Sequence, residues 1–176
     1  DKSMISLRSS RNQEGFTLVE LLIVVIILAI LAAIIVPQFS AATDDARQSA
    51  YDTNVANLRS AIDLYRQQHT AYPGFVTALG ATCINGAAVT VGAPGEDAFI
   101  AQLKNYTNSA GEACTGFDPD EFKYGPYLKD DLPENPLGTP PVSTVNVITT
   151  GVLGITTDGS GGWKFDSVTG EFIGDE

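Results

Sequence analysis

A single carboxylate lies at the start of a long apolar run. Glu20 directly precedes residues 21–36, which contain no charged side chain. A carboxylate at mid-bilayer costs about 2.5–3.5 kcal/mol on insertion scales. Two interpretations follow. Either Glu20 reaches the membrane edge and favours the positive end of a helix, or it pairs with a cation inside the apolar layer.

Cleavage after Gly15 would create such a cation, because the new α-amino group of Phe16 is positively charged. Within one subunit this amine and the Glu20 carboxylate lie about one helical turn apart. In a bundle of parallel helices, Glu20 of one subunit meets Phe16 of its neighbour. The short polar leader that ends at Gly15 favours this second interpretation.

The apolar run has the length of a membrane span. Residues 16–36 would measure roughly 30 Å as a helix, the thickness of a bilayer's hydrocarbon core. Residues 1–15 carry three basic and two acidic residues, a net charge of +1. Since the formal net charge of the whole chain is −11, residues 16–176 carry −12. The positive-inside rule predicts a cytoplasmic N-terminus and an exported body. Such an acidic body is not expected to bind nucleic acid, which needs a basic surface.

The segment before Gly15 differs from an ordinary secretory signal, because it has no apolar h-region and no Ala-x-Ala site. Met4 is the only methionine, so translation is expected to start there.

Pro37 interrupts the apolar run, and a helical pattern resumes after it. A proline inside a helix removes one backbone hydrogen bond and clashes with the preceding turn, so we expect a kink at Pro37 rather than an end. Apolar residues then recur at spacings of three and four, which indicates one buried stripe on an amphipathic helix. The stripe consists of Tyr51, Val55, Leu58, Ile62, Tyr65, His69 and Tyr72.

The C-terminal third is typical of a small sheet. β-branched residues crowd residues 142–149, and residues 163–165 and 171–173 flank a turn, which predicts a closing hairpin. Residues 154–157 are a further candidate strand, and residues 96–103 a short helix. The predicted fold is α+β: a long N-terminal helix, transmembrane in its first half and amphipathic in its second, packed on a small C-terminal antiparallel sheet.

Other residues capable of chemistry have simpler explanations. Cys83 and Cys114 are expected to form a disulfide in an oxidising compartment, the alternative being two unrelated buried thiols. His69 is the only histidine and continues the apolar stripe, so a packed histidine is expected rather than a ligand or a base. Without it no nucleophile set remains, and the chain is not expected to be an enzyme.

Residues Gly15 to Glu20, the apolar run and Pro37 together resemble the class III signal of type IV prepilins and pseudopilins. The resemblance implies that a prepilin peptidase cuts between Gly15 and Phe16 and methylates the Phe16 amine. It also implies that Glu20 neutralises a neighbouring N-terminus, or assists docking, during assembly. The expected organisation is a cleaved leader over residues 1–15, a transmembrane and polymerisation helix over residues 16–37, and a pilin-like head over residues 38–176.

The rest of the chain is similar, more loosely, to the major pseudopilin of type II secretion systems. The similar segments are residues 72–73, 125–128 and 132–136. Two features depart from that family: Leu137-Gly138 stands in place of tryptophan-glycine, and the family's calcium-binding loop has no clear equivalent. Residues 156–162 lie in about the right place but offer one carboxylate, Asp158, whereas calcium takes six to eight oxygens. A glycine-rich turn is expected there, with calcium kept as a candidate cofactor and Asp158 as its candidate ligand.

The leading prediction is a structural subunit of a type II secretion pseudopilus. The implied partners are further copies in a helical filament, minor pseudopilins or pilins, the prepilin peptidase and the inner-membrane assembly platform. The subunit is expected to span the bacterial inner membrane once before it joins a periplasmic or cell-surface filament. The alternatives are a type IV pilus subunit for adhesion, motility or DNA uptake, and a monomeric membrane-anchored binding module. A major and a minor subunit are not distinguished.

Overall fold

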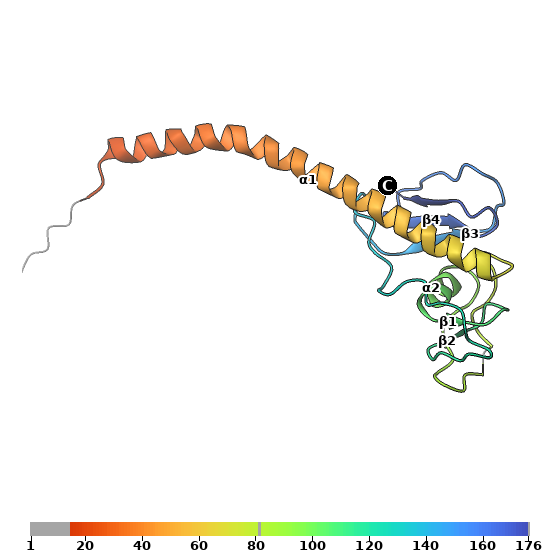
Figure 1. Cartoon of the computed structure of the whole chain (residues 1–176). Coiled ribbons are helices and arrows are strands. Elements are labelled where there is room, and N and C mark those ends of the chain that lie inside the picture. Colours follow the sequence, from red (N-terminus) through yellow and green to blue (C-terminus); the bar gives the residue numbers. More distant parts are fainter. Residues whose placement is uncertain (1–14, 81, 176) are drawn as a thin grey trace, which may run out of the picture. The chain divides into compact units, whose positions relative to one another are not determined.

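The computed structural model describes residues 15–80 and 82–175, so the predicted start at Met4 and all of the predicted leader except Gly15 lie outside the described residues. The chain forms two compact units, residues 1–43 and residues 44–176, and we call the second the head unit. The elements in chain order are α1 (Leu18–Gln68), α2 (Glu96–Lys104), β1 (Tyr106–Thr107), β2 (Ala113–Cys114), β3 (Val145–Ile148), β4 (Trp163–Asp166) and β5 (Phe172–Gly174) (Figure 1).

Helix α1 continues through Pro37, so the proline does not end the helix, as the sequence predicted. Because proline has no N–H, the carbonyl of Ala33 loses its usual helical donor, and the kink expected there stays a prediction. Every described residue of the first unit is exposed in the single chain. The apolar surface of residues 18–36 therefore has no partner among the described residues.

The second half of α1 brings the predicted stripe into the core of the head unit. Val55, Leu58, Ile62 and Tyr65 are buried, and Tyr51 and Tyr72 are partly buried. They pack in one cluster with residues of α2 and of the three-stranded sheet, which include Phe99, Leu103, Val145, Trp163, Phe165 and Phe172. The α+β arrangement of a long helix on a small sheet is thus confirmed.

The three-stranded sheet, in the order β3-β4-β5, differs from the expected antiparallel sheet in one pair. Strands β4 and β5 form the predicted hairpin, with Trp163 opposite Gly174. Strand β3 instead pairs with β4 in parallel, with Val145 opposite Trp163. Parallel neighbours need a long crossover, which residues 149–162 provide. We call this segment the crossover.

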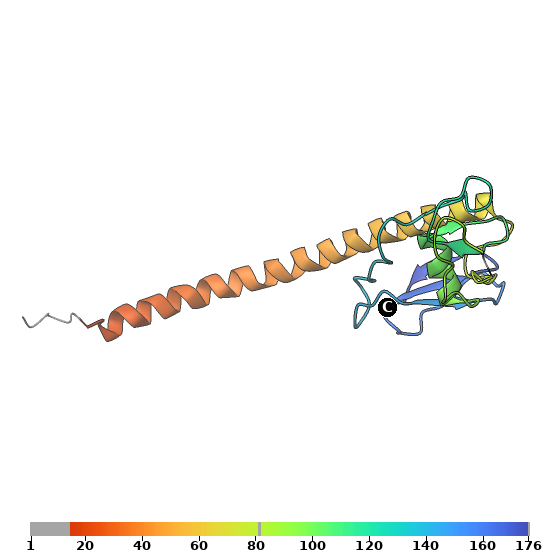
Figure 2. The same cartoon turned by 90° about the horizontal axis from the view of Figure 1, so that it is seen from below.

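A small second sheet lies beside α2. Helix α2 ends one residue beyond its predicted range, and it contacts both β3 and β1 (Figure 2). Strands β1 and β2 pair antiparallel, with Tyr106 opposite Cys114. The predicted disulfide between Cys83 and Cys114 is present and ties the loop before α2 to β2. On the chain-entropy account, a crosslink of this span stabilises the fold by about 3–4 kcal/mol.

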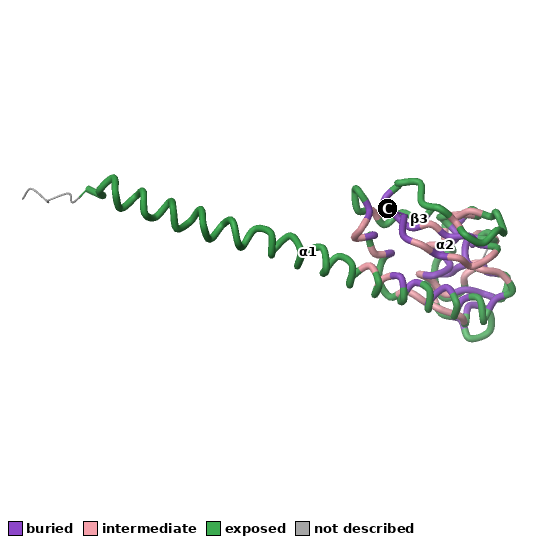
Figure 3. Tube along the Cα trace, turned by 90° about the horizontal axis from the view of Figure 1, so that it is seen from above, coloured by how far each residue is buried: buried purple, intermediate pink, exposed green. Residues whose placement is uncertain are grey.

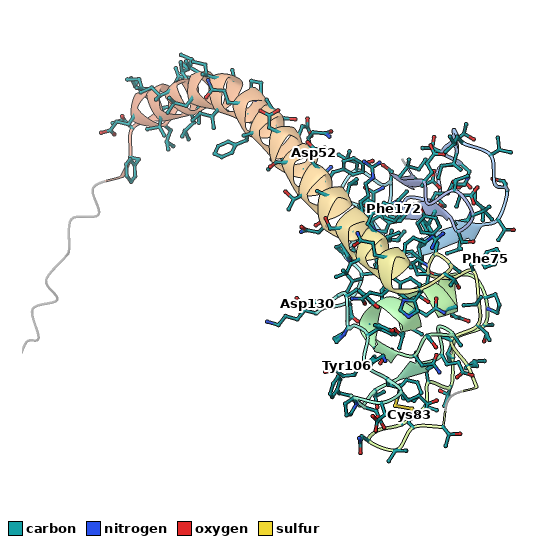
Figure 4. All side chains as sticks on the ribbon, turned by 45° about the vertical axis from the view of Figure 1, so that its right-hand side comes forward. Asp52, Phe75, Cys83, Tyr106, Asp130 and Phe172 are labelled. Carbon is teal, nitrogen blue, oxygen red and sulfur yellow. A yellow bond between two sulfur atoms is a disulfide. The ribbon has the colours of Figure 1, made fainter. Side chains whose placement is uncertain are left out.

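The buried residues gather in the head unit, where the sheet, α2 and the second half of α1 meet (Figure 3). Phe172 of β5 points into this region, and Cys83 lies at the end of the head unit that holds β1 and β2 (Figure 4).

Ile62→Ala is expected to lower the free energy of unfolding of the head unit by about 2–5 kcal/mol, because truncation at this buried site leaves a cavity. Trp163, the only tryptophan, is fully buried in the same cluster, so its fluorescence during urea denaturation measures the loss. Leu64→Ala is the matched control, since Leu64 lies on the same helix with 45% of its surface exposed. That variant is expected to lose less than about 1 kcal/mol. Equal losses in the two variants would contradict the packing of the stripe.

Candidate assembly site

The residues predicted to act in assembly lie at the N-terminal end of α1. Thr17 directly precedes the helix, and Glu20 lies in its first turn. The Thr17 hydroxyl oxygen accepts a hydrogen bond from the Glu20 N–H at 3.1 Å. In return, the Glu20 carboxylate accepts the Thr17 N–H at 2.9 Å and the Thr17 hydroxyl at 2.8 Å. This reciprocal arrangement is a capping box, which satisfies donors that a first helical turn otherwise leaves unpaired.

The capping box gives the first interpretation of Glu20 a geometric basis. The positive end of the helix dipole favours a carboxylate in the first turn, and Thr17 supplies donors that lipid does not offer. Both bonds from Thr17 reach the same oxygen, Oε2, and Oε1 of Glu20 has no hydrogen-bond partner within residues 15–80 and 82–175. Sequence reasoning missed Thr17, although the pattern of threonine followed three residues later by glutamate is a known signal for this cap.

Gly15 and Phe16 precede the cap in irregular backbone, and Phe16 is 84% exposed. A Cβ built on Gly15 would meet no other described atom within 4 Å. Packing among the described residues therefore does not explain the glycine, and its recognition by a peptidase stays a prediction. The apolar part of α1 that follows is long enough and apolar enough to cross a membrane.

A second group of charged residues holds the crossover in the head unit. Three carboxylates accept its backbone N–H groups, at distances between 2.6 and 3.1 Å; they lie at the end of β4, in the connection between β4 and β5, and directly after β5. Asp166 binds Gly151, Glu171 binds Gly154 and Ile155, and Asp175 binds Asp158, Gly159 and Ser160. Because these N–H groups donate to side chains and not to a neighbouring strand, the strand expected at residues 154–157 does not form.

Asp166 and Asp175 are fully buried. Burial alone would raise the pKa of each carboxyl group. The hydrogen bonds that they receive, from Thr150 and Ser160 among others, outweigh burial and hold both pKa values below their ordinary value.

The candidate calcium ligand, Asp158, has a different partner. Its Oδ2 lies 2.8 Å from Nζ of Lys164, and the same ammonium donates to the Thr156 carbonyl at 2.9 Å. The N–H groups of the turn point at Asp175. A calcium ion needs six to eight oxygens. The turn of residues 156–162 instead directs N–H donors toward Asp175, and the Lys164 ammonium already pairs with Asp158. The residues present therefore do not fit calcium. Among the described residues, no group of three or more His, Cys, Asp or Glu side chains is arranged to hold a metal.

Comparison with known proteins agrees with the geometry at the N-terminus. Residues 10–36 match the family described as the prokaryotic N-terminal methylation motif. The chain is 41% identical over 63 residues to the type II secretion system core protein G of Pseudomonas aeruginosa, which is 36% of this chain and 44% of that protein. The core protein G of Aeromonas hydrophila is 29% identical over 130 residues, 74% of this chain and 71% of that protein. The chain thus carries the N-terminal methylation motif and is similar to proteins named type II secretion system core protein G.

A pilus protein is also similar to this chain. The type IV narrow pilus major component PilA5 of Thermus thermophilus is 45% identical over 60 residues, 34% of this chain and 52% of that protein. The chain spans less than half the length of the Pseudomonas relative and about half that of the Thermus one. No solved structure gives a significant match.

The segment of residues 132–136 that resembles the pseudopilins has a structural role. Asn135 is fully buried, and its amide donates to the carbonyls of Gly162 at 2.9 Å and Asp175 at 3.1 Å. The indole N–H of Trp163 donates to the Pro133 carbonyl at 2.7 Å. These bonds attach the proline-rich segment to one end of the sheet, a role that sequence reasoning had not assigned.

His69 is packed, as the sequence predicted. Its ring stacks on Tyr65 with 4.0 Å between centroids, and its two nitrogens lie 2.9 Å from the Tyr65 carbonyl and 3.0 Å from the Asn108 carbonyl. Burial lowers the pKa of His69 below its ordinary value. These contacts fix the end of α1 against β1 and its turn.

Thr17→Val is expected to weaken the first turn of α1 by about 1 kcal/mol, since it removes the hydroxyl that accepts the Glu20 N–H. The Glu20 amide should then exchange its hydrogen about fivefold faster in the full chain in detergent micelles. Hydrogen exchange followed by NMR measures this. Thr17→Ser keeps the hydroxyl and should exchange like the unsubstituted chain. Identical rates in all three chains would argue against the capping box.

Acid is expected to destabilise the head unit through Asp166 and Asp175. Because their pKa values are lowered in the folded state, the stability that they contribute is complete above the ordinary carboxyl pKa of about 3.9. It is lost as the pH falls below that value toward their folded pKa values. Urea denaturation followed by Trp163 fluorescence at about pH 7 and about pH 3 measures the change. Asp175→Asn should be less stable at neutral pH and lose less stability on acidification; an unchanged pH dependence in this variant would count against the assignment.

Proposed function

We propose that the chain is a structural subunit of a type II secretion pseudopilus. The observation that carries the proposal is the N-terminus, where the methylation motif of residues 10–36 begins an apolar helix with Glu20 in its first turn. Similarity to proteins named type II secretion system core protein G supports a secretion filament over other uses of this motif. The role is mechanical, and no catalysis is assigned to the chain.

Maturation begins with cleavage between Gly15 and Phe16, which removes the leader of residues 1–15. The exposure of Phe16 supports access to this bond. Cleavage leaves a free α-amine on Phe16, which a prepilin peptidase methylates. The amine keeps its positive charge after methylation, so it remains able to pair with a carboxylate.

Assembly then brings a second partner to Glu20. The capping box engages Oε2, which leaves Oε1 available to the Phe16 amine of a neighbouring subunit. Two opposite charges that meet in an apolar layer cost less than either charge alone. As subunits leave the membrane, the exposed apolar residues 18–36 bury one another, and a bend at Pro37 adapts each helix to its neighbours.

Before assembly the subunit lies in the bacterial inner membrane as a single span. The basic leader places the N-terminus in the cytoplasm and the head outside. The disulfide between Cys83 and Cys114 suits an oxidising compartment on that side. The partners are further copies of the chain, minor pseudopilins, the prepilin peptidase and the inner-membrane assembly platform.

A type IV pilus subunit is the second candidate, because PilA5 of Thermus thermophilus is 45% identical to this chain over 60 residues. Deletion of the gene separates the two. Loss of protein secretion with normal motility, attachment and DNA uptake supports the pseudopilus. The opposite pattern supports the pilus.

Glu20→Ala is expected to leave a cleaved, membrane-held subunit whose filament yield falls about tenfold or more, since about 1.4 kcal/mol of lost contact energy corresponds to a tenfold change. The yield is measured by shearing filaments from cells and immunoblotting, and N-terminal sequencing confirms that the chain begins at Phe16. Asp45→Ala is the control, because Asp45 is an exposed carboxylate on the same helix. A normal yield from Glu20→Ala would overturn the role given to Glu20.

A further inference from the structure

The oxygen atoms of two buried carboxylates in the head unit are fully engaged. An ionised carboxylate has about four acceptor sites. Asp175 receives four donors: the N–H groups of Asp158, Gly159 and Ser160 and the Ser160 hydroxyl. Asp166 also receives four, from the Thr150 hydroxyl and the N–H groups of Gly151, Val168 and Thr169. Neither carboxylate has a lone pair left for a metal ion unless a bond to the backbone breaks.

A lysine engages two oxygens of the crossover. Lys164 extends from β4, and its side chain is only 12% exposed. Its ammonium contacts the two crossover oxygens nearest to it, the Thr156 carbonyl and the Asp158 carboxylate. A carbonyl and a carboxylate at hydrogen-bonding distance from one positive charge form the environment that a small cation would occupy in a loop of this kind.

The direction of the hydrogen bonds separates this arrangement from a metal loop. A loop that wraps a cation turns its carbonyl and carboxylate oxygens inward. The crossover instead turns backbone N–H groups toward Asp166, Glu171 and Asp175, which is how backbone binds an anion. The carboxylates of the hairpin are therefore compensated by N–H donors, and Asp158 is compensated by Lys164.

We infer that the crossover of residues 149–162 is closed by the chain's own charges, with the Lys164 ammonium in the place of a divalent cation, so that the head unit folds without calcium. Three carboxylates hold the crossover from one side, and one ammonium holds its tip. The inference concerns the single chain. It is independent of filament assembly, and the test below uses unassembled protein.

The test compares unfolding of the full chain in detergent with excess EDTA and with millimolar Ca²⁺. Trp163 is fully buried in the core of the head unit, so its fluorescence follows the unfolding of that unit. The midpoint temperature is expected to agree within about 2 °C between the two conditions, because a ligand that does not bind cannot shift the unfolding equilibrium. A rise of more than about 2 °C with Ca²⁺ overturns the inference.

A pair of lysine variants tests the role of the ammonium. Lys164→Met keeps the aliphatic stem but removes the charge, and it should lower the midpoint temperature equally with EDTA and with Ca²⁺. Lys129→Met is the matched control, because Lys129 is exposed in the same unit and forms no ion pair within the described residues. An unchanged midpoint in Lys164→Met overturns the inference.

Hydrogen exchange locates the effect in the crossover itself. The amides of residues 158–160 should be protected from exchange in EDTA, because their N–H groups donate to Asp175. Asp175→Asn should remove this protection while amides in the buried part of α1 stay slow. Unprotected amides at residues 158–160 in EDTA that become protected when Ca²⁺ is added would show a metal-closed loop and reject the inference.

Discussion

A carboxylate away from water must find hydrogen-bond donors or a cation, and much of this protein follows from that requirement. At the start of α1 the donors come from Thr17, three residues before Glu20. Lipid offers none, so the cap has to be built from the chain itself. The cap uses one oxygen of Glu20, which leaves the two interpretations of this residue compatible: it stabilises its own helix and still has an oxygen for a neighbour.

The head unit meets the same requirement with different groups. Asp166 and Asp175 are buried and form no ion pair within the described residues. Backbone N–H groups of the crossover satisfy Asp175, and donors from the crossover and from the turn after β4 satisfy Asp166. Carboxylates that are compensated by backbone N–H groups need no metal ion to keep the loop folded. A segment held by its own N–H groups and by Lys164 depends on the covalent chain and on pH, not on a dissolved metal ion.

The parts of the structure that could be predicted are those where a regular spacing of apolar residues determines which side chains are buried. The stripe from Val55 to Tyr65 repeats at the helical spacing, and the β4–β5 hairpin alternates around a short turn, so both could be read from the sequence. The crossover leaves no such pattern, because its bonds join backbone N–H groups to side chains that come later in the chain. Strands β1 and β2 contain two residues each, too few for any period. The cap at Thr17 was readable, since its signal is local.

The position of Asp175 near the end of the described chain has a consequence for the order of folding. In the proposed topology the head unit is exported behind a membrane-held N-terminus, so that β3 emerges before residue 175. Under this proposal the crossover emerges before the carboxylate that holds residues 158–160, and those bonds form only after Asp175 has emerged. Asp175 thus fixes a segment that precedes it in the chain, and a tag fused after this residue would add bulk next to the hydrogen bonds that it accepts.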